Sequence, residues 1–146
     1  MLTRTSTAVW KGGLKNGKGT MNIGKGVFDG TYTFASRFES GTGTNPEELI
    51  GAAHAGCFSM ALALMLEQEG RKPESITTTA KVKVDKVGDG FRIVGIDLST
   101  EGVVPGIDEA GFREKAEAAK KGCPVSAALA AVPITVEARL AKAKAA

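Results

Sequence analysis

GTNPEELIGAAHAGCFSMAL, residues 43–62, is the stretch of sequence that decides the fold. Asn45 is a preferred helix N-cap and Pro46 suits the first helical position, so the stretch predicts a helix that begins at Pro46. The pattern lets the helix run to Gly70, which at 1.5 Å per residue gives a length of roughly 36 Å. It is the longest element that the sequence predicts.

Between Leu49 and Leu66 this helix carries no formal charge. An uncharged run of that length raises the alternative of a membrane-spanning helix. Gly and Ala make its first half only weakly apolar, and the segments on both sides resemble strands of a soluble protein, so we prefer a helix buried on nearly every face. Because a small sheet covers only one side, we expect the same helix of a second subunit to cover the other. The helix alone therefore predicts a homodimer.

Alternation of apolar and polar residues predicts strands in the rest of the chain, over 5–11, 20–23, 31–38, 76–87, 91–101 and 134–140. A break in the alternation at Val94-Gly95 predicts a β-bulge. A second helix is predicted from a cap at Asp108 through Lys121, and Gly122 ends it. The last residues, ARLAKAKAA, are typical of a frayed basic tail.

Composition restricts the classes of protein that the chain can belong to. With 146 residues it has the length of a single domain, which we expect to cover 1–146. Its formal charge of +3 is small and diffuse, which disfavours a nucleic-acid partner. One His and two Cys make a four-ligand zinc site or a secreted disulfide scaffold improbable. MLTRTSTAVWKGG at the N-terminus lacks the apolar core of a secretory signal, so we expect a cytoplasmic protein without a membrane partner.

The two cysteines stand in different local contexts. Cys57 lies near the middle of the long helix, where on its own it is most simply a small buried apolar residue. Cys123 lies in GCPVS, residues 122–126, where Gly ends one helix and Pro begins another. Unpaired backbone N–H groups at such an N-cap position favour the thiolate. A nucleophile and a resolving partner are therefore suggested, although sequence alone does not show that they meet.

Two other motifs point to different chemistry. Residues 12–18 match the opening GxxxxGK of a phosphate-binding loop, but Gly19 stands where Ser or Thr should hold magnesium, and a strand follows, so we interpret the segment as a hairpin. His54 lies three residues before Cys57 on the same side of the helix, which leaves a Cys–His hydrolase as an alternative. A lone His in an apolar helix more often satisfies a core or interface hydrogen bond.

Taken together, the run at 43–62 and the later GCPVS closely resemble the OsmC branch of the OsmC/Ohr family of thiol-dependent peroxidases. The resemblance extends to SRFE before the long helix and to VPGID before the second one. It implies an α+β fold in which antiparallel sheets surround the long buried central helix within an intertwined homodimer.

The same resemblance implies the site residues. Cys57 matches the peroxidatic cysteine and Cys123 the resolving one. Glu47 matches the acid that in the family directly follows the helix-opening proline, and Arg37 matches an arginine on the preceding strand. In the Ohr branch this arginine comes from nearer the N-terminus.

The chemistry implied by these residues needs a thiolate and a basic partner. Burial raises a thiol pKa, whereas a nearby guanidinium such as Arg37 favours the thiolate, and Glu47 would hold that guanidinium by a bidentate pair. An organic hydroperoxide would oxidise Cys57 to a sulfenic acid, and Cys123 would close a disulfide that an external dithiol, for example of the dihydrolipoyl type, reduces. No metal, haem or flavin is expected. The alternative is a non-catalytic protein of the same fold that binds an apolar ligand.

Helix geometry adds one hypothesis about the site. Glu47 and Cys57 are ten residues apart, which on a continuous helix is about 15 Å along the axis. We therefore expect Glu47 of the partner subunit to serve each Cys57. A break in the helix near Gly51 or Gly56 is the competing explanation.

Overall fold

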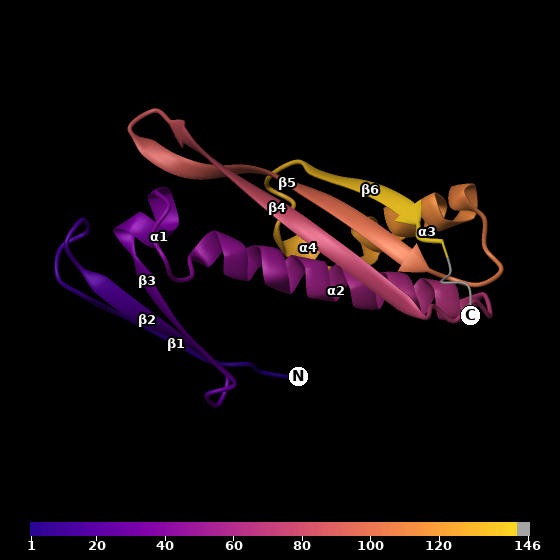
Figure 1. Cartoon of the computed structure of the whole chain (residues 1–146), viewed down its shortest axis with the longest axis horizontal. Helices are drawn as coiled ribbons and strands as arrows, with labels where there is room; N and C mark the ends of the chain where they lie inside the picture. Colours follow the sequence, from indigo (N-terminus) through magenta and orange to yellow (C-terminus); the bar gives the residue numbers. More distant parts are fainter. Residues whose placement is uncertain (143–146) are drawn as a thin grey trace. The chain divides into compact units, whose positions relative to one another are not determined.

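A computed structural model describes residues 1–142 and has an α+β fold with two three-stranded sheets and four helices among those residues (Figure 1). The α+β class predicted from the sequence is confirmed. By its contacts the chain divides into two compact units, Met1–Leu49 and Ile50–Ala146. The single domain expected over 1–146 stays a prediction.

The first unit holds an antiparallel sheet in the order β1-β2-β3, made of β1 (Ser6–Lys11), β2 (Lys18–Ile23) and β3 (Phe28–Thr33). Lys11 pairs with Lys18, so the glycine-rich residues between them form a hairpin, as predicted. Gly12 takes a φ of 93°, a conformation that favours glycine. Because a strand and not a helix begins at Lys18, the segment is no phosphate-binding loop.

The strand predicted over 31–38 is wrong in its second half. β3 ends at Thr33, and helix α1 (Phe34–Phe38) follows it. The side chain of Thr33 accepts the backbone N–H of Ser36, and Ser36 Oγ accepts the N–H of Thr33, which is a reciprocal capping box. These two local bonds start a helix where the alternation of Tyr32 and Phe34 suggested a continuing strand. Arg37 therefore lies on a short helix, and not on a strand.

Helix α2 (Pro46–Gln68) begins as predicted, with Asn45 Oδ1 accepting the N–H of Glu48 at 2.8 Å. It ends two residues earlier than predicted, since Gly70 adopts a φ of 71° and the N–H of Arg71 donates back to the Leu66 carbonyl. The helix is uninterrupted between these ends.

One stripe of α2 is fully buried within the chain, and its members recur every three or four residues: Gly51, His54, Phe58, Leu62 and Leu66. The opposite face is apolar but exposed, with Met60 at 76% and Leu64 at 55% of full exposure. This helix is the one described element that is long and apolar enough to cross a membrane, with a mean hydropathy of 1.8 over 18 residues. Because Met60 and Leu64 are exposed, a single chain does not bury α2 on nearly every face.

The second unit contains β4 (Ser75–Val87), β5 (Gly90–Val103) and β6 (Ile134–Leu140) in that order. The predicted bulge is confirmed: Lys83 pairs with Gly95 and Val84 with Ile93, so Val94 is the extra residue. β4 and β5 are antiparallel, but β6 runs parallel to β5, which corrects the expectation of purely antiparallel sheets. The reason is the helical crossover between β5 and β6, which returns the chain to the same end of the sheet.

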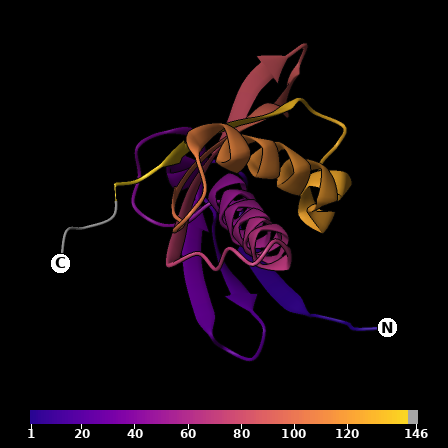
Figure 2. The same cartoon turned by 90° about the vertical axis from the view of Figure 1, so that its right-hand side faces the viewer.

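That crossover contains α3 (Glu109–Gly122), capped by Asp108, and the short α4 (Pro124–Ala128). Figure 2 views α2 nearly end-on and shows α3 beside it. Phe58, Leu62 and Leu66 of α2 share one buried cluster with Phe112 of α3 and Leu98 of β5. The cluster also contains Cys123, so the core of this unit is continuous with the candidate site.

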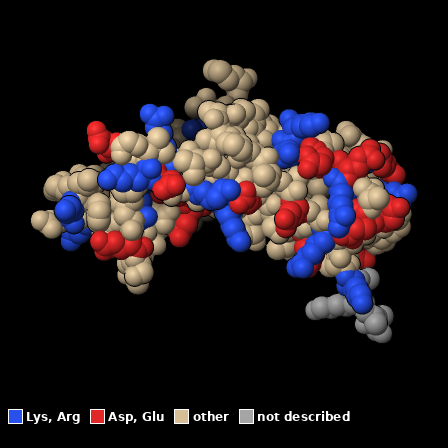
Figure 3. Space-filling view, turned by 90° about the horizontal axis from the view of Figure 1, so that it is seen from above, with Lys and Arg blue, Asp and Glu red and all other residues tan. Residues whose placement is uncertain are grey.

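The face shown in Figure 3 carries Lys and Arg interspersed with Asp and Glu, in keeping with the diffuse charge of the sequence. The predicted basic tail lies partly within β6, which includes residues 138–140, and partly outside the described residues, at 143–146.

Candidate active site

Cys57 and Cys123 are brought together in the second unit, although 66 residues separate them. Cys57 is partly exposed on α2, whereas Cys123 is fully buried at the start of α4. Both are free thiols, and a hydrogen bond joins their side chains. The contact that the sequence could not establish is therefore present.

Cys123 is the N-cap of α4, as GCPVS predicted. Its Sγ accepts the backbone N–H of Ser126 at 3.5 Å, and Pro124 occupies the first turn. Sulfur here takes the place of the usual Ser, Thr or Asp oxygen, so the cap also supplies a donor that stabilises a negative sulfur.

The surroundings move the two thiol pKa values in opposite directions. Burial raises the pKa of Cys57, the Cys123 thiol raises it further, and the Val125 N–H lowers it only in part. Burial also acts to raise the pKa of Cys123, but hydrogen bonds from the Ser126 N–H, the Cys57 thiol, the Ser126 hydroxyl and the Val125 N–H bring it below its usual value. The two thiols titrate as a coupled pair, and these contacts favour a negative charge on Cys123 more than on Cys57.

His54 does not face Cys57 as a base. It is fully buried, and its Nε2 lies 2.7 Å from Ser126 Oγ, while its Nδ1 has no hydrogen-bond partner in the part of the chain that the structure describes. Within residues 1–142 no hydrogen bond joins His54 to Cys57, so the Cys–His alternative has no geometric support. The expectation that His54 satisfies a core hydrogen bond is confirmed.

Arg37 and Glu47 form a close ion pair in the first unit. Nη2 of Arg37 donates to Glu47 Oε1 at 2.7 Å, and Nε donates to both carboxylate oxygens at 3.2 Å. Glu47 is nearly covered, with its side chain 12% exposed, while the Arg37 side chain is 39% exposed. The bidentate geometry predicted for this pair is confirmed, and it holds the guanidinium in one orientation.

The predicted site residues thus form two pairs, Cys57 with Cys123 and Arg37 with Glu47, each within its own unit. Ser126 is the residue that sequence reasoning missed, although it is buried and contacts both His54 and Cys123. The sequence did contain a signal for Ser126: it stands three residues after the N-cap Cys123, at the position whose backbone N–H bonds to the capping atom.

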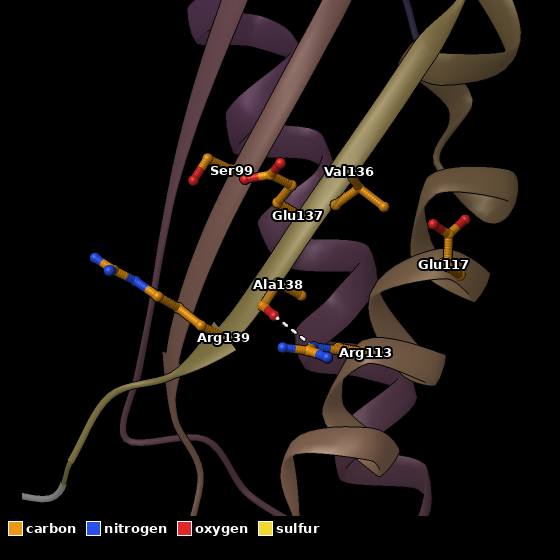
Figure 4. Close-up of a pocket in the computed structure, with 7 residues that line it drawn as sticks. All are labelled: Ser99, Arg113, Glu117, Val136, Glu137, Ala138 and Arg139. Carbon is orange, nitrogen blue, oxygen red and sulfur yellow. Dashed lines mark hydrogen bonds between the residues drawn. The ribbon is translucent and has the colours of Figure 1, made fainter.

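A separate surface hollow of about 540 Å³ lies between β6 and α3 (Figure 4). It is lined by Ser99, Arg113, Glu117, Val136, Glu137, Ala138 and Arg139. Its two arginines are ion-paired, Arg113 with Glu109 and Arg139 with Glu101, and no cysteine lines it. Among residues 1–142 no group of three His, Cys, Asp or Glu side chains is arranged to hold a metal ion.

Two hydrogen-bonded thiols, one of them at a helix cap that lowers its pKa, are typical of a thiol-redox protein. A model of the family described as OsmC-like protein matches residues 39–137. The chain belongs to this family, and the resemblance inferred from the sequence is confirmed.

Comparison with known proteins supports the same assignment. The chain is 55% identical over 125 residues to a protein named peroxiredoxin OsmC from Escherichia coli, covering 85% of this chain and 87% of that protein. It is 34% identical over 87 residues to an organic hydroperoxide resistance protein of Xanthomonas axonopodis, covering 59% of each. The crystal structure of the organic hydroperoxide resistance protein OhrB of Bacillus subtilis matches 94% of this chain and 98% of its own, with a TM-score of 0.70 and 26% identity.

Proposed function

We infer that this chain is a thiol-dependent peroxidase that reduces organic hydroperoxides to alcohols in stress defence. The observation that carries the inference is the hydrogen-bonded pair of free thiols, Cys57 and Cys123, in a member of the OsmC family. The apolar cluster around the two cysteines favours organic hydroperoxides over hydrogen peroxide.

In the proposed reaction the Cys57 thiolate attacks one peroxide oxygen. The O–O bond breaks, an alkoxide leaves and takes up a proton, and Cys57 becomes a sulfenic acid. Cys123 then attacks the Cys57 sulfur, a disulfide forms, and the oxygen leaves as water. An external dithiol, for example of the dihydrolipoyl type, reduces the disulfide, so the cycle uses no metal, haem or flavin.

Cys57 needs a positive partner for the first step because burial raises its pKa. We assign that role to Arg37, with Glu47 holding the guanidinium in place. The ion pair is prearranged, and its remaining N–H groups can stabilise both the thiolate and the departing oxygen.

We further propose that each site takes Arg37 and Glu47 from the partner subunit of a homodimer. Helix α2 is uninterrupted from Pro46 to Gln68. It therefore has no break near Gly51 or Gly56 that would fold Glu47 back toward Cys57 of the same chain. Ten residues of helix correspond to about 15 Å, which exceeds the reach of the side chains.

The exposed apolar stripe of α2 supports the homodimer. Gly56, Met60 and Leu64 recur at helical spacing on the face opposite the buried stripe. A second copy of this helix packed across them would remove large apolar side chains from water, and Gly56 would permit a close approach. We place the enzyme in the cytoplasm as a soluble protein, with a hydroperoxide and a dithiol as its partners and with neither nucleic acid nor a membrane.

The test is turnover of cumene hydroperoxide with dithiothreitol as the dithiol. The wild-type protein should consume hydroperoxide catalytically, Cys57→Ser should fall to background, and Val87→Ser, at an exposed strand end, should keep full turnover. Hydroperoxide that stays intact with folded wild-type protein would instead indicate a non-catalytic binder of apolar ligands.

A further inference from the structure

His54 is a buried titratable residue for which the proposed reaction has no role. Its ring is fully buried, and within residues 1–142 its only hydrogen bond joins Nε2 to Ser126 Oγ at 2.7 Å. Nδ1 is buried and has no partner among those residues. An orphaned N–H costs more than an orphaned acceptor lone pair, so we assign the proton to Nε2, which then donates to Ser126. Burial lowers the pKa of His54, which keeps the ring neutral in this tautomer.

Ser126 connects His54 to the cysteine pair. Since its Oγ accepts from His54, its own hydroxyl proton is free to point to another acceptor. That acceptor is Cys123, whose sulfur also receives the backbone N–H of the same serine. Hydrogen bonds in such a chain polarise one another, so the His54 donor strengthens the bond that Ser126 gives to the sulfur.

We propose that His54 is a positioning residue for the resolving step, acting through the Ser126 hydroxyl to hold a hydrogen-bond donor on the Cys123 sulfur. This inference rests on the proposed function. In the resolving step an electron pair of the Cys123 thiolate forms the S–S bond to Cys57. The S–O bond of the sulfenic acid breaks, and hydroxide leaves and takes a proton from solvent to become water. The hydroperoxide has supplied the oxidising equivalent in the preceding step.

The other groups around Cys123 leave this role to Ser126 and His54. The groups that bring the Cys123 pKa down are Ser126, the Val125 N–H and the Cys57 thiol. Lys120 and Lys121 of α3 line a surface hollow together with Ser126, but neither is among the groups that move the Cys123 pKa, and Lys120 is paired with Glu117. In the resolving step Cys57 is a sulfenic acid, so its thiol no longer donates. Apart from the sulfenic acid that Cys123 attacks, the Ser126 hydroxyl is then the one side-chain donor among these groups.

The experiment measures the two steps separately in single turnovers with cumene hydroperoxide, following sulfenic acid formation and disulfide formation. Ser126→Ala and His54→Leu should each slow disulfide formation about fivefold, the factor expected for one hydrogen bond, and should not slow sulfenic acid formation. His54→Gln, which keeps a donor near the position of Nε2, should restore most of the rate. The double variant should be no slower than Ser126→Ala alone, because His54 acts through Ser126.

A second measurement is independent of peroxide chemistry. In the Cys57→Ser background, the ultraviolet absorbance of the Cys123 thiolate should titrate at a higher pH when Ser126→Ala or His54→Leu is added. Unchanged titration and resolving rates in folded variants would overturn the proposal, as would multiplicative effects in the double variant. If wild-type protein forms no sulfenic acid, the proposed function fails, while the titration still decides the role of His54. Should His54→Leu not fold, Ser126→Ala and His54→Gln carry the same comparison.

Discussion

Arg37 and Glu47 are joined by three hydrogen bonds of 2.7 to 3.2 Å within one chain. The pair connects a helix of five residues to the first turn of the longest helix. Because the guanidinium is already oriented, any thiolate brought beside it meets a fixed positive charge without a further entropic cost.

The shared site predicts complementation between inactive subunits. Glu47→Ala and Cys57→Ser should each lose turnover, Glu47→Ala by about 10²-fold because the guanidinium loses its orientation. Mixed heterodimers should recover one intact site, formed by Cys57 of the first variant and Glu47 of the second. The measurement is turnover after unfolding and refolding the mixture, with each variant refolded alone as the control. No recovery in proven heterodimers would mean that each site belongs to one chain.

The order of the two cysteines predicts different fates for their serine variants. Cys57→Ser should leave Cys123 without a sulfenic acid partner, so neither oxidation at Cys57 nor turnover follows. Cys123→Ser should form one sulfenic acid at Cys57 and then stall or over-oxidise, because no second thiol closes the disulfide. Mass spectrometry after one equivalent of hydroperoxide distinguishes them. Retained turnover in Cys57→Ser, with oxidation on Cys123, would reverse the assignment.

The exposed stripe of α2 predicts that a charge at Met60 prevents dimerisation. Met60 is 76% exposed within one chain, so Met60→Lys should leave the monomer fold intact. At a helix–helix interface the same lysine of each subunit would be buried without a partner, at a cost of about 3 kcal/mol or more, so the dimer Kd should rise by at least about a hundredfold. Analytical ultracentrifugation measures this, with Val87→Lys as the control. Equal dimerisation of Met60→Lys and wild type would exclude this stripe as the interface.

Burial of His54 predicts a pH dependence of stability. Its pKa in the folded chain lies below 6.5, so as the pH falls below 6.5 the unfolded chain binds a proton that the folded chain does not. The stabilising contribution is complete above that pH and is lost as the pH falls through the folded-state pKa. His54 is the only histidine of the chain. Urea midpoints between about pH 7.5 and pH 5.5 should fall more steeply for the wild type than for His54→Gln. Parallel pH profiles would mean that His54 titrates normally.

Local sequence signals predicted most elements of the second unit correctly. Alternation defined β4, β5 and β6, the interrupted alternation located the bulge at Val94, and Asp108 and Pro124 marked the starts of two helices. These features depend on backbone conformation and on neighbours in the chain, which a sequence displays directly. The strand predicted through Phe38 failed for the same kind of reason, because the reciprocal bonds of Thr33 and Ser36 outweighed the alternation.

The sequence by itself determined which residues carry reactive chemistry: Cys57 and Cys123 are the only cysteines, and GCPVS places the second at a helix start. Only the tertiary structure decided that the two thiols meet, that β6 lies parallel to β5, and that Ser126 joins His54 to Cys123. Each of these contacts spans tens of residues and depends on how α2, α3 and α4 pack around one core. No local pattern encodes such packing. The buried helix around Cys57 and the helix cap at Cys123 predicted the direction of each thiol pKa, and the folded chain adds the hydrogen bonds between the two thiols and from the Ser126 side chain.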